Sequence, residues 1–254
     1  MKTLVTAIQK GGQGKTFATC HLAFDFRDRG LKVVVIDLDT QANASFTLDA
    51  FASGVVSSSL FSADRDGLST LFGGRDNEGI TLIAADAGLA NLEKLDLAQA
   101  AGALRKSIAA LGDFFDVCLI DTAPSLGVAM TAAVLAADCM ISPIELEAYS
   151  LQGMKKMVAV ISNLRKVNPT LRFLGMLPNK VDARKPRHIA NLATLRAAYP
   201  QLVMPCSVGA RDSIAEALGE QKPVWMIKKT AARKASQEVR QMAGYIYEKM
   251  EITS

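Results

Sequence analysis

The chain has 254 residues, half of them apolar, and a formal net charge of +4. A chain of this length and hydrophobicity can bury a sizeable core, and we expect a single domain over residues 1–254. No apolar run approaches the roughly 18 residues that a membrane-spanning helix needs, and Met1 leads almost directly into a strand, so we expect a cytoplasmic protein without a signal peptide. The absence of any C-x-x-C pair argues against a zinc site or a disulfide framework and predicts buried thiols at Cys20, Cys118, Cys139 and Cys206.

The charge is distributed unevenly along the chain. Residues 1–150 carry 11 lysines and arginines against 18 acidic residues, whereas residues 151–254 carry 18 against 7. The two parts therefore have net charges of −7 and +11. This excess of positive charge predicts a surface that meets a polyanion, either nucleic acid or an acidic membrane.

A glycine-rich segment near the N-terminus predicts a phosphate-binding loop. It lies between an apolar strand over residues 4–8 and a helix, and its sequence is Gln9-Lys10-Gly11-Gly12-Gln13-Gly14-Lys15-Thr16. Glycines allow positive φ angles that turn backbone N–H groups inward, and the N-terminus of the following helix attracts anions. Lys15 is placed to reach the β- and γ-phosphates of a nucleotide, and the Thr16 hydroxyl is placed to ligate Mg²⁺.

The loop departs from the general P-loop pattern in two ways. Gln9 stands where that pattern has glycine, and a second lysine, Lys10, stands at the start of the loop. With these departures the segment resembles the deviant Walker A motif of the ParA/MinD family of ATPases. The resemblance implies that residues Gly11 to Phe17 hold the nucleotide and that Lys10 reaches the nucleotide bound by a partner subunit. Phe17 replaces a threonine that is usual in the family, which removes a hydroxyl from the α-phosphate side of the site.

Two carboxylates follow the next predicted strand, Lys32–Asp37. Asp37 and Asp39 are expected at the carboxyl edge of the sheet, where open α/β sheets bind ligands. Carboxylates beside bound phosphates need Mg²⁺ or water between them. We therefore expect this pair to bind the hydration shell of Mg²⁺ and to activate a water molecule. The stretch also resembles the family's second signature, which implies that Asp39 orients the attacking water and that Asp37 supports the metal site. Thr40 takes the place of the usual proline.

A third carboxylate ends the apolar strand expected over Phe115–Asp121, which is the pattern of a Walker B motif, and Asp121 would hold Mg²⁺ through water. The following segment, 122–127, resembles the family's switch segment, which senses the γ-phosphate. Strands that alternate with helices predict a doubly wound, mainly parallel α/β sheet with helices on both faces. The other expected strands are 79–85, 139–144, 173–182 and 202–206. Residues 88–111 are expected to be mainly helical, a helix is expected over about 151–166, and residues 46–79 show only helices and loops.

The segment Asn179-Lys180-Val181-Asp182 does not decide whether the nucleotide base is adenine or guanine, because Asn-Lys-x-Asp is also the guanine-reading motif of GTPases. In a GTPase, Asp182 would accept hydrogen bonds from guanine. The ParA resemblance instead places Asn179 against adenine and Pro205 where the adenine pocket is completed. Because the phosphate loop is of the deviant kind, we favour ATP.

Basic residues gather after residue 183 and predict nonspecific DNA binding. Each lysine or arginine that displaces counterions strengthens the contact with phosphates regardless of base sequence. With few residues before the glycine loop, no helix-turn-helix is expected. His188 is expected on this surface beside Arg187, whereas His21 is expected to pack inside. The candidate DNA-binding residues are Arg184, Lys185, Arg187, Arg211, Lys228, Lys229, Arg233 and Lys234.

The resemblance covers nearly the whole chain and is strongest to the short plasmid partition ParA proteins, the IncC-like group. It implies an ATPase that uses ATP and Mg²⁺, forms a homodimer in the ATP state and binds DNA nonspecifically at the nucleoid. Hydrolysis stimulated by a ParB-type centromere-binding protein would then return monomers with weaker affinity for DNA.

Two other functions remain open. A MinD-like positioning ATPase would dock on a membrane through a basic amphipathic C-terminal helix. The tail Met242–Ser254 carries two acids and one base, so we expect no membrane partner. A metabolic enzyme of the same superfamily, such as an iron–sulfur reductase or an amide-forming ligase, is disfavoured by the cysteine spacing and by the basic C-terminal part.

Overall fold

The computed structural model describes residues 1–62, 65–74, 77–146, 158–160, 162–163 and 165–252. The strands are β1 (Lys2–Thr6), β2 (Val33–Leu38), β3 (Ala52–Val56), β4 (Ile80–Ala84), β5 (Val117–Thr122), β6 (Cys139–Glu145) and β7 (Arg172–Asn179). The α-helices are α1 (Lys15–Asp28), α2 (Asn43–Thr47), α3 (Arg65–Gly73), α4 (Leu97–Leu111), α5 (Val128–Ala136), α7 (Pro186–Ala198), α8 (Asp212–Gly219) and α9 (Thr230–Met250). The 3₁₀ helices are η1 (Asp49–Phe51), η2 (Ser57–Phe61), η3 (Ala87–Lys94) and η4 (Val224–Met226).

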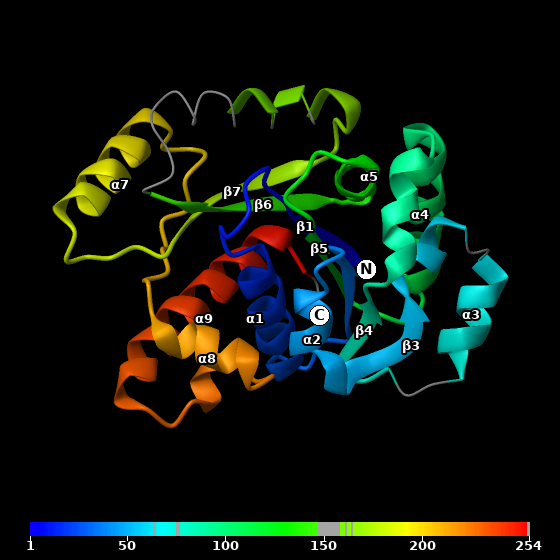
Figure 1. Cartoon of the computed structure of the whole chain (residues 1–254), viewed down its shortest axis with the longest axis horizontal. Helices are drawn as coiled ribbons and strands as arrows, with labels where there is room; N and C mark the ends of the chain where they lie inside the picture. Colours follow the sequence, from blue (N-terminus) through cyan, green and yellow to red (C-terminus); the bar gives the residue numbers. More distant parts are fainter. Residues whose placement is uncertain (63–64, 75–76, 147–157, 161, 164, 253–254) are drawn as a thin grey trace.

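The strands form one seven-stranded sheet in the order β3-β4-β2-β5-β1-β6-β7 (Figure 1). Every adjacent pair is parallel. Parallel neighbours cannot be joined by tight hairpins, so the chain crosses from strand to strand through helices. It begins with the central strand β1, then builds the β3-β4-β2-β5 half, and finally returns past β1 to β6 and β7. The predicted doubly wound α/β fold is confirmed.

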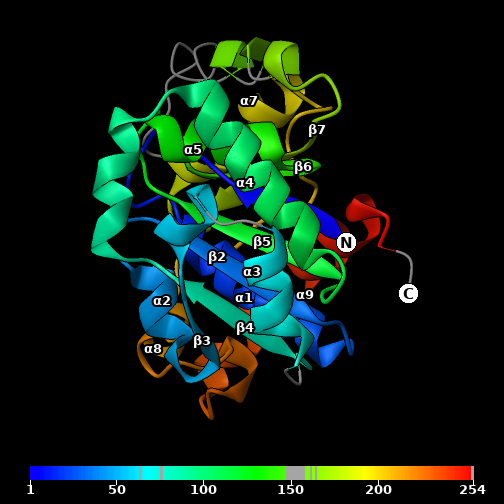
Figure 2. The ribbon, with the colours of Figure 1, turned by 90° about the vertical axis from the view of Figure 1, so that its right-hand side faces the viewer.

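Helices cover both faces of the sheet, which explains why the inner strands are apolar on both faces. In β2, Val33 and Val35 belong to the core beneath α1, α8 and α9, whereas Val34 and Ile36 belong to the core beneath α3, α4 and α5. Figures 1 and 2 show the two groups of helices on opposite sides of the sheet. Within the described part of the chain, no helix is long and apolar enough to cross a bilayer.

Several elements differ from the sequence prediction. Residues 52–56 form the edge strand β3, which was missed because it pairs only with β4 and buries only Val55, so it lacks the apolar run of an inner strand. Residues 88–111 are mainly helical as predicted, and they are divided into η3 and α4, where the Asp96 side chain caps α4 by accepting from the Gln99 N–H. The strand predicted over 202–206 is reduced to one bridge between Val203 and Met176. Most of the helix predicted near 151–166 lies outside the described residues, and the four cysteines are buried as predicted.

Candidate functional site

The candidate residues meet at the carboxyl end of the central strands. Asp121 near the end of β5 lies in register with Thr6 of β1 and with Asp37 of β2. The chain leaves β1 directly into the glycine loop, so the parallel register brings the loop and both carboxylates to one edge of the sheet. Open parallel sheets bind their ligands at this edge.

The glycine loop has the backbone geometry of an anion site. Gly12 and Gly14 have φ angles of 74° and 98°, in the left-handed region that glycine adopts without strain. Helix α1 begins at Lys15, and its N-cap residue Gly14 supplies no side-chain cap. The first N–H groups of α1 therefore point toward the loop with the positive end of the helix dipole behind them, which suits a phosphate.

Residues at the ends of β6 and β7 hold the loop from behind. The Gln13 side chain is buried, and its Oε1 accepts from the Glu145 N–H at 2.8 Å. Asn179 Nδ2 donates to the Gln13 carbonyl at 2.8 Å, and Lys180 Nζ donates to the Gly12 carbonyl at 2.7 Å. Lys180 also pairs with Glu145 at 2.5 Å. Asn179 thus braces the phosphate loop, and its contact with adenine stays a prediction.

A cavity of about 480 Å³ opens over the loop, a size that suits a small organic ligand. The predicted residues that line it are Gly11, Gly12, Gly14, Lys15, Thr16, Phe17 and Asp39. Pro205, predicted at the adenine pocket, is not among the described residues that line this cavity. Pro124, from the predicted switch segment 122–127, also lines it. The lining residues that were not among the predicted site residues are Gln41, Asn43, Phe46, Thr47, Lys180, Leu218 and Gly219. Most of them come from α2 and from the end of α8, which carry no recognisable motif.

Thr16 and Asp121 form a site that fits Mg²⁺. The Thr16 hydroxyl donates to Asp121 Oδ2 at 2.6 Å. Asp121 Oδ1 is buried and has no hydrogen-bond partner among the described residues. Burial, with Asp37 nearby, raises the pKa of Asp121 to about 8. A buried carboxylate with an unused oxygen favours a cation, and magnesium commonly takes one or two protein oxygens together with water and phosphate oxygens.

The described residues contain no cluster of three or more His, Cys, Asp or Glu side chains that could form a metal cage. Asp37, predicted to support the metal, already has both oxygens engaged. Its Oδ1 accepts from the Asp39 N–H, and its Oδ2 accepts from the N–H and the hydroxyl of Ser45 at 2.8 Å each. Asp37 thereby holds the turn that carries Asp39, which lies in the cavity lining.

The two lysines of the loop have different surroundings. Lys15 is buried, and this burial lowers its pKa, while the carboxylates of Asp121 and Asp39 oppose the shift. Lys10 is exposed at the start of the loop. Lys15 therefore faces the site of its own chain, whereas Lys10 lies where another molecule could approach.

The predicted DNA-binding residues fall into two exposed groups. Arg184, Lys185 and Arg187 precede or begin α7, and Arg184 pairs with Asp182 while its side chain stays 90% exposed. Lys228, Lys229, Arg233 and Lys234 lie at the start of α9 and are also exposed. Lys229 pairs with Glu216 at 2.6 Å. Arg211 is half-buried and makes two hydrogen bonds to Glu238, so its positive charge is paired with a carboxylate of the same chain.

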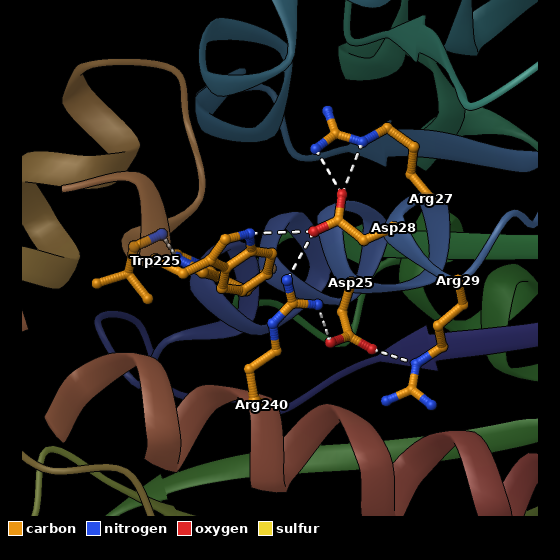
Figure 3. Close-up of polar contacts among 8 residues, drawn as sticks. Asp25, Arg27, Asp28, Arg29, Trp225 and Arg240 are labelled. Atoms are coloured by element: carbon orange, nitrogen blue, oxygen red, sulfur yellow. Dashed lines mark hydrogen bonds and ion pairs between the residues drawn. The ribbon is translucent and has the colours of Figure 1, made fainter. Parts of the chain in front are cut away.

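A polar cluster that sequence reasoning missed joins α1 to α9 (Figure 3). The fully buried carboxylate of Asp25 lies between Arg29, at 2.6 Å, and Arg240, at 2.5 Å. Arg240 also pairs with Asp28, and its guanidinium lies 3.6 Å from the ring centre of Trp225. The spacing of Asp25 and Asp28 on one helix was a signal, but Trp225 and Arg240, which complete the cluster, lie about 200 residues further along the chain.

The two histidines are both buried. His21 packs inside as predicted, and its ring also bridges the Phe17 carbonyl and the Val224 N–H, at 3.0 and 3.2 Å. The prediction that His188 lies on the surface is wrong, because it is only 4% exposed. Its Nδ1 accepts from the Asp182 N–H, so it holds the turn that leads to the basic residues before α7.

Several known proteins are similar to this chain in sequence or in fold. Residues 1–173 match the family described as an AAA domain. Protein IncC from Escherichia coli is 77% identical over 252 residues, which cover 99% of this chain and 70% of that protein. Cobyrinic acid a,c-diamide synthase from Mycobacterium smegmatis, solved with ADP and magnesium, has a TM-score of 0.74 at 25% identity, covering 99% of this chain and 96% of that one. An ATP complex of a McdA variant from Cyanothece has a TM-score of 0.81 at 23% identity, covering 100% and 98%, which shows the fold alone. The chain therefore belongs to this AAA domain family and, within it, to the ParA-type proteins of the IncC group.

Proposed function

We propose that the chain is an ATP-dependent DNA partition ATPase that works as a single ParA-type domain over residues 1–254. The observation that carries the proposal is the glycine loop with its two lysines, Lys15 buried in the cavity and Lys10 exposed at the start of the loop. The solved relative with ADP and magnesium supports ATP and Mg²⁺ as the ligands of this cavity.

The residues around the cavity have separate roles in this proposal. The N–H groups of the loop and Lys15 hold the phosphates, and Thr16 with Asp121 holds Mg²⁺, which neutralises charge on the phosphate oxygens. Asp39 orients the attacking water, and Asp37 keeps Asp39 in place through the turn that ends at Ser45. Lys10 crosses to the partner subunit in an ATP-bound homodimer and stabilises charge there, as an arginine finger does.

DNA binding and release complete the proposed cycle. Dimerisation brings together the exposed basic residues at the start of α9 and before α7, which gives nonspecific affinity for DNA at the nucleoid in the cytoplasm. A ParB-type centromere-binding partner stimulates hydrolysis, and the resulting monomers bind DNA more weakly. The similarity to the chromosome-partitioning ATPase Soj from Thermus thermophilus, which is 31% identical over 85% of this chain and 84% of that protein, supports a role in DNA partition.

Three substitutions test the proposal when nucleotide affinity, dimerisation and turnover are measured together. Lys15→Ala is expected to abolish nucleotide binding, because no other lysine of the loop is buried at the phosphate site. Lys10→Ala is expected to bind nucleotide but not to dimerise with ATP. Asp39→Ala is expected to remain trapped as an ATP-bound dimer.

Lys106→Ala is the matched control for Lys10→Ala, because Lys106 is also an exposed lysine and lies on α4 outside the cavity lining. Normal dimerisation and hydrolysis by Lys10→Ala would contradict the role of this lysine in the partner's site. Normal turnover by Asp39→Ala would remove Asp39 from water positioning.

A further inference from the structure

The N-terminus of α5 is held by a carboxylate from a distant segment. Both oxygens of Glu93, in η3, accept from the Val128 N–H, at 3.1 and 3.2 Å. Val128 is the first residue of α5, and the N-cap residue Gly127 supplies no side-chain cap of its own. The first turn of α5 also contains no acidic residue. Glu93 therefore supplies from outside the helix the acceptor that a helix N-terminus needs.

Gly127 leaves the space that this contact requires. A Cβ on Gly127 would lie 2.0 Å from Glu93 Oε1 and 2.7 Å from its Cδ. The backbone of Gly127 has φ −76° and ψ −179°, which any residue can adopt, so the glycine is needed for space and not for conformation. An alanine here would push the flexible Glu93 side chain away while leaving the backbone unstrained.

Glu93 thereby fixes the C-terminal end of segment 123–127, which lies beside the glycine loop at Gly11. The other end is fixed where the Thr122 hydroxyl donates to the Thr6 carbonyl at 2.8 Å. Between these anchors, Pro124 lines the cavity and lies 3.9 Å from the position of a Cβ on Gly11. The middle of the segment, residues 124–126, is exposed and is not held by burial in the core. The path of the segment therefore depends on the contacts at its two ends.

We propose that Glu93 is a positioning residue that holds segment 123–127 in place for the terminal phosphate of the bound nucleotide. This inference rests on the proposed function as an ATPase. A segment ordered in advance binds the third phosphate without first losing conformational freedom, whereas ADP binding uses the glycine loop and does not need the segment. Loss of the Glu93 contact should therefore weaken the preference for ATP over ADP and leave ADP affinity unchanged.

The test compares the affinities of the full chain for AMPPNP and ADP, each with Mg²⁺, by titration calorimetry. Glu93→Ala removes the acceptor, and Gly127→Ala displaces it by steric contact. Both variants are expected to lower the AMPPNP-to-ADP preference about fivefold, the effect of losing one helix cap. Glu93→Gln keeps an acceptor oxygen and should retain most of the preference. Gly102→Ala is the matched glycine control, because nothing lies within 4 Å of a Cβ at that position.

An unchanged preference in both Glu93→Ala and Gly127→Ala would overturn the positioning role. An equal loss of AMPPNP and ADP affinity would also overturn it, because that result indicates a general effect on folding. Wild-type protein that binds neither nucleotide would contradict the proposed ATPase function itself, and with it this inference.

Discussion

Asn179 lies directly against Gly14. Its Nδ2 donates to the carbonyl of the preceding residue, Gln13, and is 2.1 Å from where a Cβ on Gly14 would stand. The Asn179 side chain at the end of β7 therefore holds the phosphate loop in position, and it leaves room only for glycine at position 14. The contact connects the end of the sheet to the start of α1.

Gly14→Ala is expected to disrupt the loop and strongly reduce nucleotide binding. The substitution forces alanine to a φ of 98° and into Asn179, which is buried and cannot move aside. The strain is about 1–3 kcal/mol, and relieving it would distort the phosphate site. Nucleotide titration and chemical denaturation check this result. Gly102→Ala, inside α4, is the control and should raise stability by about 1 kcal/mol. Full nucleotide affinity in Gly14→Ala would contradict the proposed role of this contact.

His21 is expected to make a contribution to stability that is lost as the pH falls from 6.5 to about 4. Burial lowers the pKa of His21 from 6.5 to about 4, so in this window the unfolded chain binds a proton that the folded chain does not. The His21 contribution to the free energy of unfolding therefore decreases as the pH falls, by up to about 3 kcal/mol, whereas Asp121, whose pKa is raised, acts in the opposite direction. Denaturation at several pH values measures the slope. His21→Gln can still bridge Phe17 and Val224 but does not titrate, so below pH 6.5 the variant should lose less stability with falling pH than the wild type, and the difference between the two pH profiles gives the His21 contribution. An equal slope in this variant would assign the effect to other groups.

Arg240→Ala is expected to destabilise the protein by about 3 kcal/mol, because it leaves the buried carboxylate of Asp25 with Arg29 alone and removes the stacking on Trp225. Arg240→Lys keeps the charge but loses the fork that reaches both Asp25 and Asp28, so an intermediate loss is expected. Thermal and chemical denaturation measure both effects. Arg172→Ala is the arginine control, since its pair with Glu251 is exposed and should contribute at most about 1 kcal/mol. Equal effects of the two alanine variants would show that burial of Asp25 does not matter.

Charge reversal at Arg233 and Lys234 is expected to weaken DNA binding and to lower its salt dependence. Both side chains are exposed at the start of α9, and each phosphate contact adds roughly one unit to the slope of log affinity against log salt. ATP affinity should not change, because neither residue lines the cavity. Arg211→Gln should instead lower stability, because Glu238 loses its partner. Unchanged DNA affinity after the reversal would place the DNA interface on another surface.

Much of the fold could be predicted from sequence because the inner strands are apolar runs, and β2 and β5 each carry an aspartate near the end of the run. Val33–Leu38 is buried on both faces, and the glycine loop has a specific pattern between strand and helix. The edge strand β3 could not be found in this way, because an exposed strand with Ser53 and Gly54 has neither an apolar run nor clear alternation.

Predictions of individual side chains were less secure, since sequence shows charge but not partners. Arg211 and Lys229 are predicted DNA contacts, and the sequence did not show that each also pairs with a glutamate from another helix. His188 follows a basic run but turns inward to accept a hydrogen bond from the Asp182 backbone. Glu93 carries no motif, and its role depends on a contact 35 residues away. Such pairings arise from tertiary packing, which local patterns do not encode.

The most direct test of the central claim is binding of the protein to a random-sequence DNA duplex at two salt concentrations, with ATP, with ADP and without nucleotide, always with Mg²⁺. The proposed partition ATPase predicts binding that requires ATP and falls steeply as salt rises, because the basic surfaces are brought together only in the ATP state. Absence of binding in every nucleotide state, or equal binding in all of them, would contradict the proposal that ATP controls attachment to DNA.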